Sequence, residues 1–165
     1  MKHPEMKKYR NNGAIGALLD EYEKAIFELQ AILTTVNNSE LVENADPDTE
    51  DPECRSIQTV LSHVVESAYT YAISIQNSQG KNLPYRTIDL QNTCEEYHQA
   101  ISAVFAYTEQ VFNDFPSIKL EEYSEDKKIL MRWGQHYDPE QLMEHAIVHI
   151  LRHRRQIEKF LARIK

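Results

Sequence analysis

The chain has 165 residues, and its 18 basic and 26 acidic side chains give a net charge of −8. This length fits one compact domain over residues 1–165, which can bury a hydrophobic core without a disulfide or a structural metal. The acidic balance argues against a nucleic-acid-binding protein, and no stretch approaches the roughly 18 apolar residues that a membrane span needs.

The two cysteines, Cys54 and Cys94, are too few for a disulfide framework, and neither belongs to a CxxC pair. The first residues contain no apolar core, so no signal peptide is expected. These features predict a cytoplasmic protein in a reducing compartment. The chain has only four glycines and six prolines, and this scarcity of turn residues favours helices over an all-β or Rossmann-like fold.

Apolar side chains recur at spacings of three and four residues in four long segments, which indicates four amphipathic helices. The first helix is expected to run from about Ala14 to Val36 and to stop at the polar residues 37–39. Between Glu40 and Glu53 there are seven acids and no base. This acidic run is interpreted as a solvated loop.

The second helix is expected to open at Asp51 and Pro52. Aspartate is a good N-cap, and proline fits the first helical position because its missing N–H would have no partner there. The apolar stripe of this helix ends where the polar residues 77–80 break the pattern.

The third helix begins somewhere between Thr87 and Thr93. Thr93 and Glu96 have the spacing of a capping box, and Thr87 is an equally plausible start. Pro116 ends this helix. The segment that follows contains the single tryptophan, Trp133. This segment is expected to cover one side of the core, and it can contain a short extended stretch.

The fourth helix starts with Asp138 as N-cap and Pro139 in the first position, and Gln141 can close a capping box. It is expected to run to about Ile164. Four helices of this length predict an all-α fold, an antiparallel four-helix bundle in which each helix buries one apolar face.

Three of the seven histidines, His145, His149 and His153, lie in this last helix. At 100° per residue His149 lies about 40° from His153, inside the apolar face, and His145 lies about 80° away at its edge. Buried imidazoles need hydrogen-bond partners, and the surrounding Leu, Ile and Ala side chains offer none. A divalent cation held by two histidines one turn apart would satisfy both rings.

A third ligand has to come from another helix, and His63 in the second helix is the candidate. It lies about 100° from Val64, on a flank that faces a neighbouring helix in a bundle. Three histidine ligands leave one coordination position open, which is the pattern of catalytic sites. Imidazole suits zinc, nickel, copper and iron, so the ligand set leaves the metal open.

The remaining histidines are assigned no ligand role. His145 is expected to lie beside the site or to be partly exposed, near Glu144 and Arg152. The other three are expected at the surface: His3, His98 and His136. Glu66 lies one turn past His63 but points away from it on the helical wheel, so it is not expected to act as a base.

Two segments resemble the DinB/YfiT-like superfamily of metal-dependent proteins. In LSHVVESAYTY, in the second helix, the histidine of the family falls on His63. EHAIVHILRHRRQI, in the fourth helix, is similar to the HxxxH-R-x-Q-I ending of the family, whose ligands fall on His149 and His153. Arg154 and Gln156 follow in their places. The usual glycine before the glutamine is Arg155 here, a departure that leaves the ligands intact.

The resemblance implies an up-down-down-up bundle with long crossover connections and a three-histidine site for zinc, nickel or another divalent cation. It also implies a homodimer in many cases. Family members with assigned chemistry are mostly transferases or isomerases that depend on small cellular thiols such as bacillithiol or mycothiol, and many members have no assigned function. No nucleic-acid or membrane partner is implied.

Two hypotheses involve a metal. In the first, the protein is a metal-dependent enzyme, a small-thiol-dependent S-transferase or a metal-dependent hydrolase, acting on an unidentified small molecule. A thiol or water bound to the metal would be the nucleophile. Arg152, Arg154 and Gln156 are candidates for orienting an anionic substrate, although a surface role that complements the helix dipole is favoured for each. In the second, the protein is a metal-binding or stress-associated bundle without enzymatic activity.

A third hypothesis needs no metal. The protein would be a structural or partner-binding bundle whose histidines bond to Tyr71, Ser67 or water. The residues alone do not choose among the three.

Overall fold

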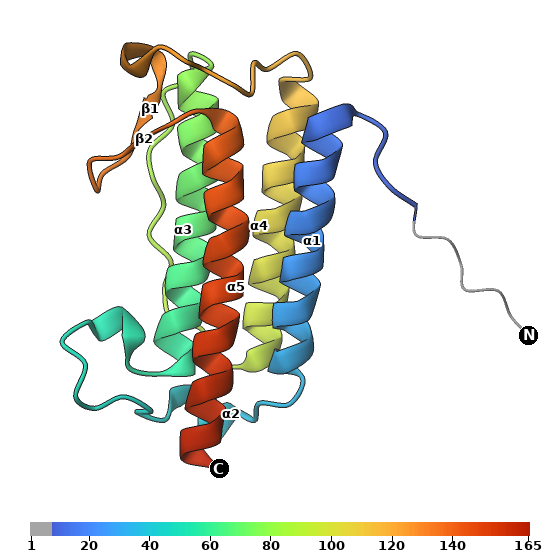
Figure 1. Cartoon of the computed structure of the whole chain (residues 1–165). Helices are drawn as coiled ribbons and strands as arrows, with labels where there is room; N and C mark the ends of the chain where they lie inside the picture. The colour runs from blue at the N-terminus through green and yellow to red at the C-terminus, as the bar shows by residue number, and fades with distance from the viewer. Residues whose placement is uncertain (1–7) are drawn as a thin grey trace, which may run out of the picture.

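The computed structural model describes residues 8–165, so His3 lies outside the described residues. Four long helices pack side by side (Figure 1): α1 (Gly13–Leu33), α3 (Ile57–Ser78), α4 (Cys94–Asp114) and α5 (Pro139–Ile164). The helices α1 and α5 run in one direction, and α3 and α4 run in the other. Both α1 and α3 pack against α4 and α5, so α1 lies diagonally across from α3. The expectation of an all-α fold is confirmed at the level of a mostly helical chain.

The first helix ends earlier than the sequence predicts, because α1 stops at Leu33 and a separate short helix follows. This helix, α2 (Asn38–Val42), lies where the sequence predicts the start of a solvated loop. The side chain of Asn37 accepts hydrogen bonds from the N–H groups of Ser39 and Glu40, and the Glu40 carboxylate accepts from the N–H of Asn37. This reciprocal capping box provides the local reason for the extra turn.

The prediction that the second helix opens at Asp51 is wrong. Asp51 and Pro52 instead begin a single 3-10 turn, η1 (Pro52–Cys54), in which the Asp51 carboxylate accepts from the N–H of Glu53. The long helix α3 begins at Ile57, where Ser56 and Thr59 form its capping box. An aspartate followed by proline starts a turn of either kind, and here the η1 turn packs against α3 rather than extending it.

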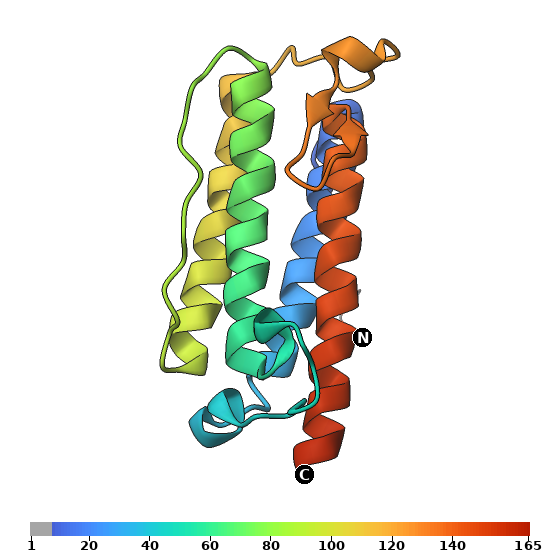
Figure 2. The ribbon, with the colours of Figure 1, turned by 90° about the vertical axis from the view of Figure 1, so that its left-hand side faces the viewer.

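The other predicted starts are confirmed. Helix α4 begins at Cys94 with Thr93 and Glu96 as its capping box, so the Thr87 alternative is wrong. Helix α5 begins at Pro139 with Asp138 as N-cap and Gln141 closing the box. The residues between α3 and α4 run as an extended segment along these two helices (Figure 2).

A small hairpin precedes α5 and contains the extended stretch that the sequence allows. After a 3-10 turn, η2 (Glu125–Lys127), strand β1 (Ile129–Leu130) pairs antiparallel with β2 (His136–Tyr137). Gly134 turns the chain between them with a φ of 86°, a conformation that a side chain would strain. Because β1 packs against α3 and β2 against α5, the hairpin bridges these two helices at one end of the bundle (Figure 1).

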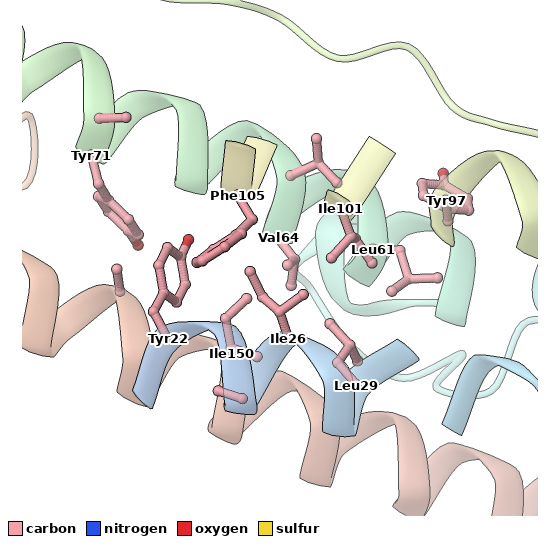
Figure 3. Close-up of a cluster of buried hydrophobic side chains, with 14 of the residues drawn as sticks. Tyr22, Ile26, Leu29, Leu61, Val64, Tyr71, Tyr97, Ile101, Phe105 and Ile150 are labelled. Atoms are coloured by element: carbon pink, nitrogen blue, oxygen red, sulfur yellow. The ribbon is translucent and has the colours of Figure 1, made fainter. Parts of the chain in front are cut away.

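The core lies between the four helices and is aromatic at its centre (Figure 3). Tyr22 of α1 and Phe105 of α4 meet edge to face with ring centroids 5.8 Å apart. Apolar side chains from all four helices surround them, among them Leu29, Leu61 and Ile101. Burying each side chain of this size stabilises the fold by about 1.5–3 kcal/mol. Within residues 8–165, no helix combines the length and hydropathy of a membrane-crossing segment.

Candidate metal centre

The three histidines that the sequence singles out come together between α3 and α5. The Nε2 atom of His149 lies 3.0 Å from Nε2 of His63 and 3.1 Å from Nε2 of His153. The three potential ligand atoms all lie within 4.8 Å of one another. His153 is only 3% exposed, and the other two rings are half-buried. The one-turn spacing on α5 and the packing of α3 against it produce this arrangement.

Two of the three rings are held from outside by oxygen atoms. Nδ1 of His63 lies 2.9 Å from a carboxylate oxygen of Glu53, and Nδ1 of His153 lies 2.8 Å from Oε1 of Gln156. A carboxylate oxygen and an amide oxygen only accept hydrogen bonds, so each Nδ1 carries the proton. The Nε2 atoms of His63 and His153 therefore both face the centre of the cluster, where a neutral ring carries a lone pair.

The cluster has fewer hydrogen-bond donors than these inward-facing Nε2 lone pairs need. Nε2 of His149 can donate to one neighbour at most, so at least one inward lone pair has no proton to accept. Burial, together with the neighbouring histidines and Arg152, lowers the pKa of His149 to about 2. Burial also lowers the pKa of His153 to about 4, so both rings are neutral at pH 7.

A divalent cation matches this donor set. Three Nε2 atoms at metal–nitrogen distances of about 2.0–2.1 Å would lie about 3.3 Å apart around a tetrahedral ion. The observed separations of 3.0 and 3.1 Å involving His149 are close to that value. The residues therefore fit a metal ion on geometry, protonation and outer hydrogen bonds alike.

Aromatic rings form a wall beside His149. The ring of His145 lies nearly parallel to that of His149 and to that of Trp133, with centroids 6.1 and 5.5 Å away. Tyr71 of α3 meets both histidine rings edge to face. Burial raises the pKa of Tyr71 to about 12, so its hydroxyl stays protonated at neutral pH. His145 is thus a neighbour of the cluster, as the sequence predicts.

The η1 turn brings a cysteine to the outside of the cluster. The thiol of Cys54 lies 3.4 Å from a carboxylate oxygen of Asp51 and also hydrogen-bonds with Gln156. Burial raises the pKa of this thiol. Gln156 therefore connects Cys54 with the ring of His153.

The three residues that the sequence suggests for orienting an anionic substrate, Arg152, Arg154 and Gln156, take different positions relative to the histidine cluster. Gln156 contacts His153, as described above. Arg152 is exposed, and its positive charge lowers the pKa values of His149 and His153, so it lies close to the cluster. Arg154 instead forms an ion pair with Glu28 and so joins α5 to α1, which is a structural role.

The other candidates take no part in the cluster. The Glu66 carboxylate accepts from the N–H of Ile88 and lines the same cavity as His63, so the prediction that it points away from His63 is wrong. His136 is exposed and pairs with Glu125, and His98 is half-buried on α4.

The sequence interpretation missed Glu53 and understated Trp133. The sequence predicts that Glu53 lies in a solvated acidic loop, and only the fold of η1 places it beside His63. The sequence predicts that the segment containing Trp133 covers one side of the core, yet Trp133 itself is 46% exposed and stacks on His145. No periodic pattern marks either position. A carboxylate shortly before a suspected ligand helix was the one available signal for Glu53.

A mostly helical fold with three converging histidines defines a class of bundle proteins that could hold a metal ion. The family model described as "DinB family" matches residues 51–163, which include all three histidines. This is more than half of the chain, so the protein belongs to the DinB family. None of the curated proteins and none of the solved structures compared with the chain matches it.

Proposed function

We propose that this protein is a divalent-metal-dependent enzyme in which His63, His149 and His153 hold one cation, zinc or nickel. The observation that carries the proposal is the set of three inward-facing Nε2 atoms, two of which have their outer Nδ1 atoms engaged. The proposal includes the up-down-down-up bundle with long crossover connections for residues 1–165. The directions of the four helices in Figure 1 support that part.

Three ligands would leave a coordination position open for a water or a thiol. A bound divalent cation would lower the pKa of that molecule and make it a nucleophile at neutral pH. Glu53 and Gln156 hold the rings of His63 and His153 in the orientation that coordination requires. The aromatic wall of Tyr71, Trp133 and His145 limits access of water to one side of the cluster.

The favoured reaction is transfer of a small thiol to an electrophilic substrate. The thiolate sulfur attacks the electrophilic carbon, a carbon–sulfur bond forms, and the leaving group departs with its electron pair. The positive charge of Arg152 beside the cluster supports an anionic nucleophile. Hydrolysis is the variant in which water takes the place of the thiol. The resemblance to thiol-dependent DinB/YfiT-like enzymes supports the first variant.

Metal titration tests the site. We expect the chelator-treated protein to bind one equivalent of zinc or nickel in calorimetry. His149→Ala should lower that affinity at least a hundredfold, because a bidentate remnant is left. His136→Ala, an exposed histidine outside the cluster, serves as the matched control. Stoichiometric binding that survives His149→Ala would overturn the assignment.

Turnover separates the enzyme from a binding protein. The metal-loaded protein is incubated with an electrophile such as monobromobimane and a series of small thiols, and an ester substrate tests the hydrolase variant. We expect metal-dependent rates with at least one of them. Stoichiometric metal binding without turnover in either assay would favour a metal-binding protein without enzymatic activity.

A further inference from the structure

The C-terminal half of α5 and the residue that follows it, Lys165, carry six cations that fall into two groups. Three of them pair with carboxylates: Arg154 with Glu28, Arg163 with Asp46, and Lys165 with Glu40. The other three form no ion pair with any acid in the part of the chain that the structure describes: Arg152, Arg155 and Lys159. A protein with eight more acids than bases thus leaves three neighbouring cations without a carboxylate partner.

These three cations share one face of the helix. Their spacing of three and four residues places them within an arc of about 60°. Together with Gln156, they line a cleft of about 500 Å³. Gln156 also accepts the hydrogen bond from Nδ1 of His153, so the cleft adjoins the histidine cluster.

The helix dipole does not account for all of these charges. Its effect is confined to the last turn of a helix, which in α5 includes Arg163. Arg152 and Arg155 lie at least two turns before the end of the helix, away from its free carbonyl groups, and the charge of Arg152 acts on Cys54 and His153. Unpaired guanidinium groups in a cleft are suited to a ligand carboxylate or phosphate, which arginine can hold through two parallel hydrogen bonds.

We propose that this cleft is an anion subsite, in which Arg152, Arg155 and Lys159 bind a carboxylate or phosphate group of the molecule that reacts at the histidine cluster. This inference rests on the proposed function for the identity of the reacting centre. It assigns the substrate or the thiol co-substrate to the class of small anionic molecules.

The test compares two small thiols that differ only in the charge of the group at the end opposite the thiol sulfur. Cobalt-loaded protein is titrated with 2-mercaptoethanesulfonate, which carries an anion, and with 2-mercaptoethanol, which does not. The absorption band of the cobalt–thiolate bond reports binding at equal thiolate concentration. We expect the anionic thiol to bind about tenfold more tightly to the wild-type protein. The triple variant Arg152→Gln/Arg155→Gln/Lys159→Gln should remove that preference, each single change accounting for about twofold.

Two controls separate this site from the general positive charge of the helix and from the metal. Arg163→Gln removes a cation of the same helix that already has a partner, and it should keep the preference. Because Arg152 also favours a thiolate at the cluster, the readout is the ratio of the two affinities, and the affinity for 2-mercaptoethanol should fall less than the affinity for 2-mercaptoethanesulfonate in the triple variant. Equal affinity of the two thiols for the wild-type protein, or an unchanged preference in the triple variant, would overturn the anion subsite.

A metal-free arm distinguishes the two proposals. Inorganic phosphate and succinate are titrated into the chelator-treated protein and its triple variant, and the stronger binder identifies the anion chemistry of the cleft. If the protein shows no cobalt absorption band, the metal site is contradicted, but the anion subsite is not. The anion subsite is then supported if phosphate or succinate binds to the wild-type protein and not to the triple variant. If neither phosphate nor succinate binds to the wild-type protein, the anion subsite is contradicted as well.

Discussion

Single residues outside the histidine cluster determine how its rings are oriented. Gln156 follows His153 by three positions on the same helix, so this contact is a local consequence of helical spacing. Glu53 reaches His63 from a different element, across the η1 turn. The sequence could therefore suggest Gln156, and it placed this residue near the site, whereas the role of Glu53 depends on a turn that no periodic pattern predicts.

We expect Glu53→Gln to lower the affinity for zinc or nickel about tenfold to a hundredfold, because an amide orients the ring of His63 less well and lowers its basicity. Competition with a chromophoric chelator measures the change. Glu50→Gln alters an exposed carboxylate of the same acidic segment and should leave the affinity unchanged. Wild-type affinity in Glu53→Gln would show that this contact has no influence on the metal.

At the scale of the elements, the predicted helix starts are correct where a capping box marks them. The boxes at Thr93 and Asp138 are local and reciprocal, and both helices begin where these boxes predict. The predicted start of α3 at Asp51 is wrong because Asp51 caps a 3-10 turn with the same chemistry that caps a helix. Which of the two forms depends on how η1 packs against α3, a contact between elements.

Asp138 is a cap whose contribution can be measured. Its carboxylate accepts from the N–H of Gln141 at 2.8 Å and from the N–H of Glu122 at 3.3 Å, and the residue is 7% exposed. We expect Asp138→Ala to lower the free energy of unfolding by about 1–2 kcal/mol in urea titrations. Asp48→Ala, an exposed loop position, should change it by less than about 0.5 kcal/mol. Metal affinity should stay unchanged, since His149 lies about three turns from the cap. A loss of metal affinity would contradict a purely local effect.

At the scale of the whole molecule, the buried histidines connect pH to the stability of the metal-free protein. The folded state keeps His149 and His153 neutral, with pKa values of about 2 and 4, while in the unfolded chain each has a pKa near 6.5. Below pH 6.5 these two histidines therefore bind protons in the unfolded state but stay unprotonated in the folded state. Stability contributed by these groups is present above pH 6.5 and is lost as the pH falls from there toward the folded pKa values.

Urea titrations in the presence of a chelator test this coupling. Between pH 6.5 and 5 we expect the free energy of unfolding to fall by roughly 2–4 kcal/mol. His149→Leu should reduce that slope by about half, because one of the two groups is gone, and the exposed His136→Gln should keep the wild-type slope. An unchanged slope in His149→Leu would mean that the buried ring does not control the pH dependence.

The order of amino acids alone was sufficient for the four long helices, for two of their capped starts and for the shared face of His149 and His153. All of these follow from local chemistry and from the 3.6-residue period of the helix. The resemblance to the DinB/YfiT-like proteins already pointed to His63 as the third member.

Tertiary structure decided which side chains meet across elements. It brought His63 within hydrogen-bond distance of His149, placed Glu53 behind it, and set Trp133 against His145. It also separated the paired cations of α5 from the three that line the cleft. These contacts depend on how the helices, the η1 turn and the hairpin pack together, and a periodic pattern within one segment carries no information about the rotation or height of its neighbour.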